Sequence, residues 1–231
     1  MDADDNRGSS AVMAPEEPGA LQILISEHAG LSSARSLAYN EAFTRGDMFL
    51  GFLSMSLVAL ALISQASPGR DFLAITAIVL TFDLVVGLTT FGRILAAGYE
   101  DYIAVHGMAR IRNAYLKLAP SVRPYVTSSP HDDLAGVMLA YGNPPTRGGS
   151  AVIYGLTTSS GMIMLVLSML AAVLAVVVAM LAGASIELTL MAAAAAFVVI
   201  LAALGASTFR YYMRKQAIIS VLFPTPPDEG E

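Results

Sequence analysis

The sequence predicts an all-α integral membrane protein with four transmembrane helices, arranged as two hairpins with a cytoplasmic helical segment between them. Hydrophobic residues make up 55% of the 231 residues and charged residues only 13%, with a mean hydropathy of +0.64. Soluble domains are roughly 45–50% apolar and about 25% charged. The apolar residues are gathered in four blocks. This distribution favours one membrane domain over two soluble ones.

The first hairpin is predicted at residues 48–97 and follows two polar segments. Residues 1–19 are acidic and rich in Gly, Ser and Pro, which predicts a disordered N-terminus because they cannot bury enough apolar surface to fold. Residues 20–47 predict an amphipathic cytoplasmic helix that lies on the membrane surface or against the cytoplasmic segment. The apolar run 48–66 reaches roughly 28 Å as a helix, enough to cross a hydrocarbon core. A Pro-Gly pair at Pro68 then predicts a turn.

A long helix between Phe72 and Leu118 organises the rest of the chain. It begins as an apolar stretch with one acid, Asp83, near its middle, and passes into a charged sequence without a proline or any strong turn signal. These features predict a membrane helix that continues into a water-exposed helix. The charged part belongs to the cytoplasmic helical segment, which is predicted at residues 98–150.

A second, short helix is predicted within this cytoplasmic segment. The proline-containing stretch 119–124 ends the long helix. Ser129 is then the predicted N-cap and Pro130 the first helical residue, with Asp132 and Asp133 in the first turn. The helix is expected to stop before the Gly- and Pro-rich link that follows.

The second hairpin is predicted at residues 151–209, with apolar runs at 161–184 and 186–209. The tail, residues 210–231, begins basic and ends acidic and proline-rich. An alternative with three spans, in which these two runs form one hairpin that does not cross fully, remains open. Small residues at intervals of four predict close packing of the two helices on each other or on another copy of the protein; they are Ala175, Ala179, Gly183, Ala192, Ala196, Ala202 and Ala206.

The basic residues predict the orientation of the chain in the membrane. With four spans, both termini and residues 93–150 lie on one side, which carries twelve of the thirteen Lys and Arg residues, and only Arg70 lies on the other. Because positive residues are retained in the cytoplasm, the N- and C-termini are predicted to be cytoplasmic, in the cell (inner or plasma) membrane. The net charge of −5 arises mostly from the acidic ends and does not indicate a nucleic-acid partner.

Asp83 is the candidate intramembrane polar site. A carboxylate near the bilayer centre is costly unless it is paired, protonated or facing water. One interpretation is a proton or cation relay, or a group that lines a pore. The other is a neutral acid that holds two helices together by hydrogen bonding to Ser54, Ser56 or a threonine of another span.

A candidate cytoplasmic interaction face combines charged residues of the 20–47 helix and the long helix: Arg35, Glu41, Glu100, Asp101, His106, Arg110 and Arg112. Glu100 and Asp101 are too far from the two later arginines to pair on one helix, so they are expected to bridge to the 20–47 helix. Arg110, Arg112 and Lys117 either form an ion-paired helix face or bind anionic lipid headgroups or a phosphorylated ligand.

No catalytic, metal or cofactor site is predicted. His106, His131 and the nearby acids match no metal-ligand spacing. The sequence contains no phosphate loop, dinucleotide fingerprint or nucleophile–base arrangement. The chain has no cysteine, which excludes disulfides and thiolate sites. We therefore predict that the protein is not an enzyme.

A set of short motifs is spread over roughly residues 24 to 215: Ser26-Glu27-His28, Arg35-Ser36-Leu37, Asn40-Glu41-Ala42-Phe43, Met108-Ala109-Arg110-Ile111-Arg112, Tyr115 and His131-Asp132-Asp133. In these residues the chain resembles a set of uncharacterised bacterial four-span integral membrane proteins. This resemblance implies a fold but no activity, ligand or partner. The layout of a membrane hairpin beside cytoplasmic helices is more loosely similar to membrane-spanning bacterial defence effectors.

Two functions remain open from the sequence. The first is a non-enzymatic inner-membrane scaffold or sensor whose cytoplasmic helices bind a protein, a lipid headgroup or a small signal. The alternative is an oligomeric pore or ion/proton pathway that involves Asp83. The expected partners are the lipid bilayer, further copies of the chain in a homo-oligomer, and a cytoplasmic protein.

Overall fold

A computed structural model describes residues 19–66, 69–142 and 155–226. These residues form helices, turns and irregular segments, and none of them lies in a β-strand. The predictions for the acidic N-terminus before residue 19, for the turn at Pro68, for the link after residue 142 and for the acidic end of the tail lie at least partly outside the described residues.

The chain divides into two compact units. The described part of unit 1 comprises residues 19–33, 102–142 and 220–226, and that of unit 2 comprises residues 34–101 and 155–219. Among the described residues, four helices each contain a stretch long and apolar enough to cross a membrane, in agreement with the four predicted spans.

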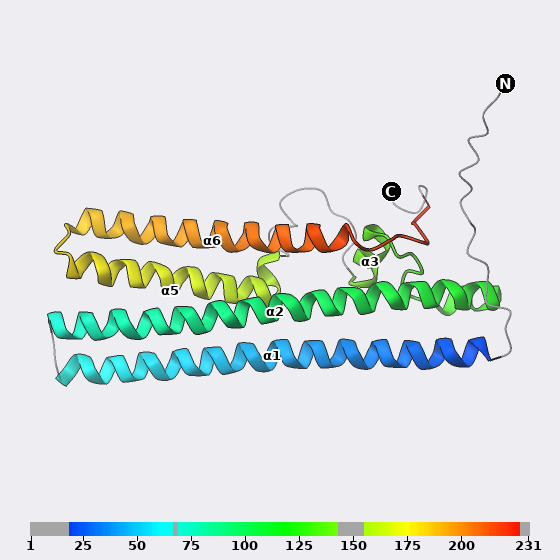
Figure 1. The fold of residues 1–231 in the computed structure, drawn as a ribbon, viewed down its shortest axis with the longest axis horizontal. Helices are drawn as coiled ribbons and strands as arrows, with labels where there is room; N and C mark the ends of the chain where they lie inside the picture. The colour runs from blue at the N-terminus through cyan, green and yellow to red at the C-terminus, as the bar shows by residue number, and fades with distance from the viewer. Residues whose placement is uncertain (1–18, 67–68, 143–154, 227–231) are drawn as a thin grey trace, which may run out of the picture. The chain divides into compact units, whose positions relative to one another are not determined.

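The first two helices are longer than the spans that they contain (Figure 1). Helix α1 covers Ala20–Ala66 and α2 covers Arg70–Leu118. The continuous α2 was predicted, whereas the predicted separation of an amphipathic helix 20–47 from a span 48–66 does not occur. Neither helix contains a proline, so nothing interrupts the backbone hydrogen bonds where the composition changes.

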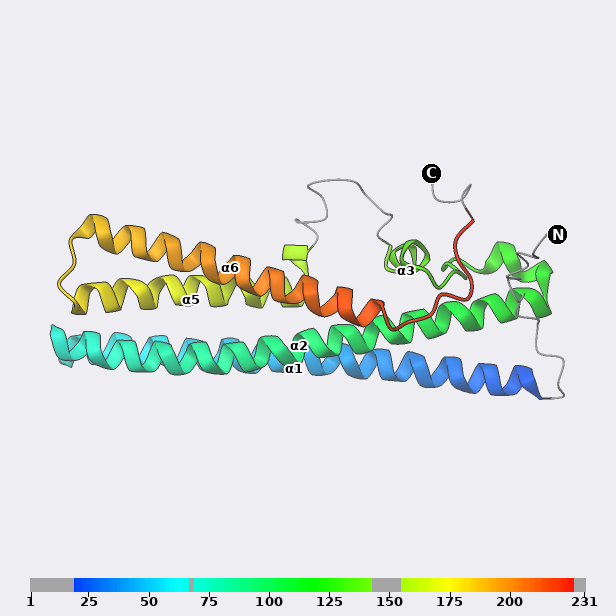
Figure 2. The same cartoon turned by 45° about the horizontal axis from the view of Figure 1, so that its top comes forward.

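Helices α5 (Ser159–Leu181) and α6 (Ile186–Gln216) lie side by side in both views (Figures 1 and 2). Each begins with a hydroxyl N-cap: Thr158 accepts a hydrogen bond from the Gly161 amide, and Ser185 accepts one from the Leu188 amide. Helix α6 continues seven residues beyond the predicted end of the fourth span at Phe209. The last turns of the helix are polar.

The core of unit 2 is built where α1, α2 and α5 meet. A β-carbon added to Gly87 of α2 would lie 2.4 Å from Leu167 Cδ2 and 2.7 Å from Phe49 Cζ, so the absence of a side chain allows these helices to approach. Phe49 and Leu167 are fully buried. A second apolar cluster, nearer the α1–α2 connection, contains Leu60, Leu80, Leu170 and Val177.

The small residues of α5 and α6 differ in burial. Ala175, Ala179, Ala192 and Ala196 are half-buried, whereas Gly183, Ala202 and Ala206 are exposed. Only part of the predicted small-residue pattern therefore faces other parts of the described chain. A role of the exposed part in packing against another copy stays a prediction.

Unit 1 surrounds the polar end of α2 with short elements. Helix α2 ends at Leu118, as the prolines of the following stretch predicted. The 3-10 helix η1 (Pro120–Tyr125) follows it, and α3 (Leu134–Ala140) comes next. The prediction that Ser129 caps this short helix was wrong. Asp133 is the N-cap and accepts a hydrogen bond from the Gly136 amide at 3.0 Å, while the Ser129 hydroxyl accepts one from the His131 amide in the preceding turn.

Gly87 generates a prediction about the stability of unit 2. We expect Gly87→Ala to destabilise the protein by about 1–3 kcal/mol, because the new methyl group would overlap Leu167 and Phe49. Gly92→Ala is the matched control, because Gly92 is exposed on the same helix and nothing lies within 4 Å of its added β-carbon. Thermal unfolding in detergent, followed by circular dichroism, should show a lower midpoint for Gly87→Ala alone. Equal midpoints would contradict the close approach.

Candidate functional site

Asp83 is fully buried in unit 2 and links α2 to α1. The Ser56 hydroxyl donates a hydrogen bond to Asp83 Oδ1 at 2.9 Å. The other oxygen, Oδ2, has no hydrogen-bond partner among the described residues. Of the serines considered from the sequence, Ser54 instead donates to the Leu50 carbonyl of its own helix. Asp83 therefore has one interhelical bond and one unused acceptor.

Ion pairs join α1 and α2 in unit 2 where the two helices become polar. Arg35 Nε donates to Asp101 Oδ1 at 2.7 Å, which confirms the expected bridge from Asp101 to α1. Arg93 donates to both carboxylate oxygens of Glu41, at 2.8 and 2.7 Å. Glu100 was also expected to pair with α1, but its ion-pair partner is Arg93 of its own helix, at 3.5 Å. Two-pronged arginine–carboxylate contacts such as Arg93–Glu41 fix geometry as well as charge.

The most highly connected polar group in unit 1 is Asp132, which is 1% exposed. Its carboxylate accepts hydrogen bonds from Arg110 Nε at 2.8 Å, from the Phe223 amide at 2.6 Å and from the Leu222 amide at 3.0 Å. The Asp132 amide in turn donates to the Phe223 carbonyl at 3.0 Å, and Arg110 also donates to the Ser220 carbonyl. We call this set the Asp132 clasp: Asp132, Arg110 and the backbone of residues 220–223.

Neighbouring contacts extend the clasp along the C-terminal segment. Besides capping α3, Asp133 accepts hydrogen bonds from the Thr225 amide and hydroxyl, at 3.1 and 2.7 Å. The Lys117 ammonium lies 4.7 Å from the centre of the Phe223 ring, within the range of a cation–π interaction. Two adjacent acids thus hold a segment about ninety residues away in the sequence.

The electrostatics of the clasp favour ionised carboxylates. Burial alone would raise the pKa of Asp132, but the Leu222 and Phe223 amides and the Arg110 guanidinium outweigh it and hold that pKa below its usual range. The pKa of Asp133 is also lowered, because the bonds from Thr225 and Gly136 outweigh its partial burial. Both Asp132 oxygens are occupied by donors. Asp132 is therefore suited to holding the chain rather than to acting as a base.

The residues of the predicted cytoplasmic face fall into both units. Arg35, Glu41, Glu100 and Asp101 belong to unit 2, whereas His106, Arg110 and Arg112 belong to unit 1. Asp101 and His106 are each 5% exposed, so they do not lie on a surface open to a partner. Their burial follows from the neighbouring contacts: Asp101 pairs with Arg35, and His106 Nε2 lies 3.8 Å from Asp132 Oδ2. Arg112 donates to the Ser129 carbonyl at 3.3 Å.

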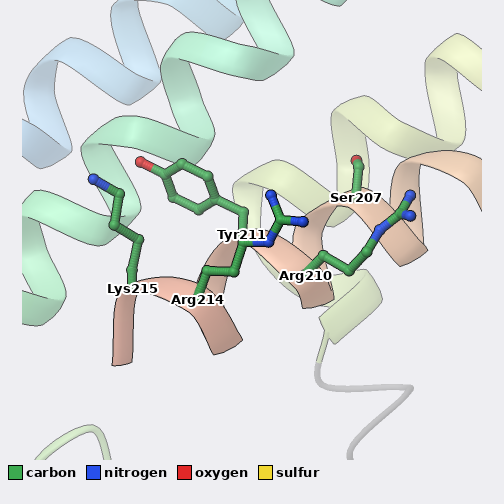
Figure 3. Close-up of a pocket in the computed structure, with 5 residues that line it drawn as sticks. All are labelled: Ser207, Arg210, Tyr211, Arg214 and Lys215. Carbon is green, nitrogen blue, oxygen red and sulfur yellow. The ribbon is translucent and has the colours of Figure 1, made fainter. Parts of the chain in front are cut away.

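Sequence reasoning missed two groups of residues. It placed Asp132 in the first turn of a helix and did not connect it to residues 220–223, because no motif marks a contact over that separation. It also passed over a basic cluster at the end of α6, formed by Ser207, Arg210, Tyr211, Arg214 and Lys215 (Figure 3). The spacing of Arg210 and Arg214 by four residues directly after an apolar run is a signal that could have identified this cluster.

Within the described ranges, no group of three or more His, Asp or Glu side chains is placed to hold a metal ion. No family model matches the chain, and neither the curated proteins nor the solved structures show a significant match to it. The resemblance to bacterial four-span proteins therefore stays a prediction.

The clasp predicts how residues 220–225 respond to a change at Asp132. We expect Asp132→Asn to increase hydrogen exchange of the Leu222 and Phe223 amides at least about tenfold. The neutral side chain loses the charge-assisted bond to Arg110, and a hydrogen bond to a charged group contributes about 1.5–3 kcal/mol. Mass spectrometry of the exchanged peptides in detergent measures this effect.

The matched control is Asp47→Asn, because it makes the same chemical change at an exposed position of α1. Equal protection of residues 220–225 in Asp132→Asn and Asp47→Asn would show that the carboxylate does not retain the segment.

Proposed function

We propose that the protein is a non-enzymatic scaffold or sensor of the inner membrane, and that its polar helical part binds a cytoplasmic protein. In this proposal the four spans form two hairpins, the helical segment 98–150 is cytoplasmic, and both termini lie on the same side. The distribution of Lys and Arg supports this orientation, since only Arg70 is assigned to the opposite side.

The observation that carries the proposal is the continuity of α2. One helix supplies Asp83 to the apolar interior of unit 2 and Arg110 to the clasp of unit 1. A helix that leaves the membrane without a break connects the polar unit directly to a membrane span, as a scaffold requires. The occupied state of the Asp132 carboxylate supports a structural role of this unit over a catalytic one.

Tyr125 marks a surface of the polar unit that is available to a partner. Its side chain is 84% exposed, on the 3-10 helix that follows α2. Large exposed aromatic side chains are enriched at protein interfaces. At the opposite end of the membrane spans in the proposed topology, Ile186 at the start of α6 is 72% exposed.

Photo-crosslinking in living cells tests the proposal at these two positions. With a photoreactive phenylalanine analogue in place of Tyr125, we expect discrete adducts with cytoplasmic protein. The same analogue at Ile186 should yield lipid adducts only. Mass spectrometry of the adducts identifies the partner and its compartment.

Combining the Tyr125 probe with Asp132→Asn tests whether binding depends on the folded polar unit, and Asp47→Asn is the matched control. Adducts should weaken only with Asp132→Asn. Two results would overturn the proposal: no Tyr125 adduct above the Ile186 background, or adducts with proteins from the other side of the membrane.

The alternative, an oligomeric pore or ion pathway, is favoured by one observation: Asp83 Oδ2 is buried and has no hydrogen-bond partner among the described residues. If Asp83 lines a conduit in an oligomer, Asp83→Asn should change proton or cation flux in proteoliposomes by about tenfold or more, because a carboxylate ring attracts cations. Ser54→Ala is the control, since Ser54 bonds only within its helix. Identical flux from wild type and Asp83→Asn, or none from either, would exclude the pore.

A further inference from the structure

The C-terminal end of α6 carries an open basic pocket of about 470 Å³ (Figure 3). Ser207, Arg210, Tyr211, Arg214 and Lys215 line it, and Figure 3 shows these side chains projecting from one side of the last turns of the helix. The lining thus contains three cations, two hydroxyl groups and no acid. The pocket begins where the fourth apolar run ends, at the depth where the headgroup region of a bilayer starts.

The charges of the pocket are not neutralised within the described part of the chain. Among those residues, Arg210, Arg214 and Lys215 form no ion pair. Arg210 donates through Nε to the Ala206 carbonyl at 3.3 Å, which leaves its terminal nitrogens available. The Lys215 ammonium lies 5.2 Å from the centre of the Tyr99 ring. Because Arg210 and Arg214 are one helical turn apart, they repel each other unless an anion lies between them.

The neighbouring acids of α2 are already engaged. Glu100, which interacts electrostatically with Tyr211, lies 3.5 Å from Arg93. Asp101 is bound to Arg35 at 2.7 Å. The dipole of α6 favours basic residues in its last turn, but the dipole does not require them to line a common pocket. The unmatched charge is therefore available to an anion from outside the chain.

The chemistry of the lining selects the kind of anion. Guanidinium groups bind phosphate through paired N–H donors, and the Tyr211 hydroxyl can donate a further hydrogen bond. Beside the pocket, Phe209 is 66% exposed and Met213 is 52% exposed, so α6 also presents apolar surface to an acyl chain. We propose that this pocket binds the phosphate group of an anionic membrane lipid.

This inference depends on the membrane placement of α6 and not on the scaffold function, so the two can fail separately. The test is native mass spectrometry of the full chain in detergent, titrated with phosphatidylglycerol or phosphatidylcholine. Wild type should bind phosphatidylglycerol more tightly than phosphatidylcholine. Arg210→Gln/Arg214→Gln should weaken phosphatidylglycerol binding at least tenfold.

Arg45→Gln/Arg123→Gln removes the same charge at two exposed positions outside the pocket and should leave binding unchanged. Arg214→Lys keeps the charge but loses the planar fork, so it should weaken binding to an intermediate degree. Glycerol phosphate, added as a soluble competitor, should displace the lipid only at much higher concentration. Equal binding by the pocket and control variants, equal binding of both lipids, or displacement by equimolar glycerol phosphate would each overturn the lipid site.

Discussion

The hydrogen-bonded backbone of α2 runs without a break from Arg70 to Leu118, and this continuity determines where the polar groups of the chain find their partners. A continuous helix satisfies its own backbone in lipid and in water alike. Its side chains must then change along the same axis from apolar to charged. Several charges on α2 are paired by another element or by a residue further along α2 itself, and the described contacts show both arrangements.

In unit 2 the pairing is between helices. Ser56 of α1 donates to Asp83, and further along the same two helices Arg35 and Glu41 pair with Asp101 and Arg93. Surface ion pairs contribute little, about 0–1 kcal/mol each, but the Arg35–Asp101 pair is partly buried and well aligned. Such contacts hold α1 and α2 together in their polar part, away from the apolar packing around Gly87.

In unit 1 the partners of α2 come from segments remote in the sequence. Arg110 meets Asp132, and the same carboxylate gathers two backbone amides of the C-terminal segment. A buried charge is tolerated when it is paired and its hydrogen bonds are satisfied. Because Asp132 meets both conditions, its charge is tolerated in the interior of unit 1.

The sequence by itself determined the four apolar helices, the unbroken α2 and the end of that helix at the prolines after Leu118. These features depend on composition and local hydrogen bonding, which are readable along the chain. It also predicted the bridge from Asp101 to α1, because the next basic residues of α2 after Asp101, Arg110 and Arg112, are too far along the helix to pair with it. It divided α1 wrongly, since a change in amphipathicity does not end a helix that lacks a breaking residue.

Only the tertiary structure decided which groups meet across long separations. Asp132 accepts hydrogen bonds from the Leu222 and Phe223 amides, and Asp133, rather than Ser129, takes the capping position of α3. The basic side chains at the end of α6 line one pocket. The physical reason is the same in each case. A carboxylate or a guanidinium can form a hydrogen bond with any suitable group that folding brings near. Every non-proline residue has a backbone amide, so residue type does not indicate which amides donate to Asp132.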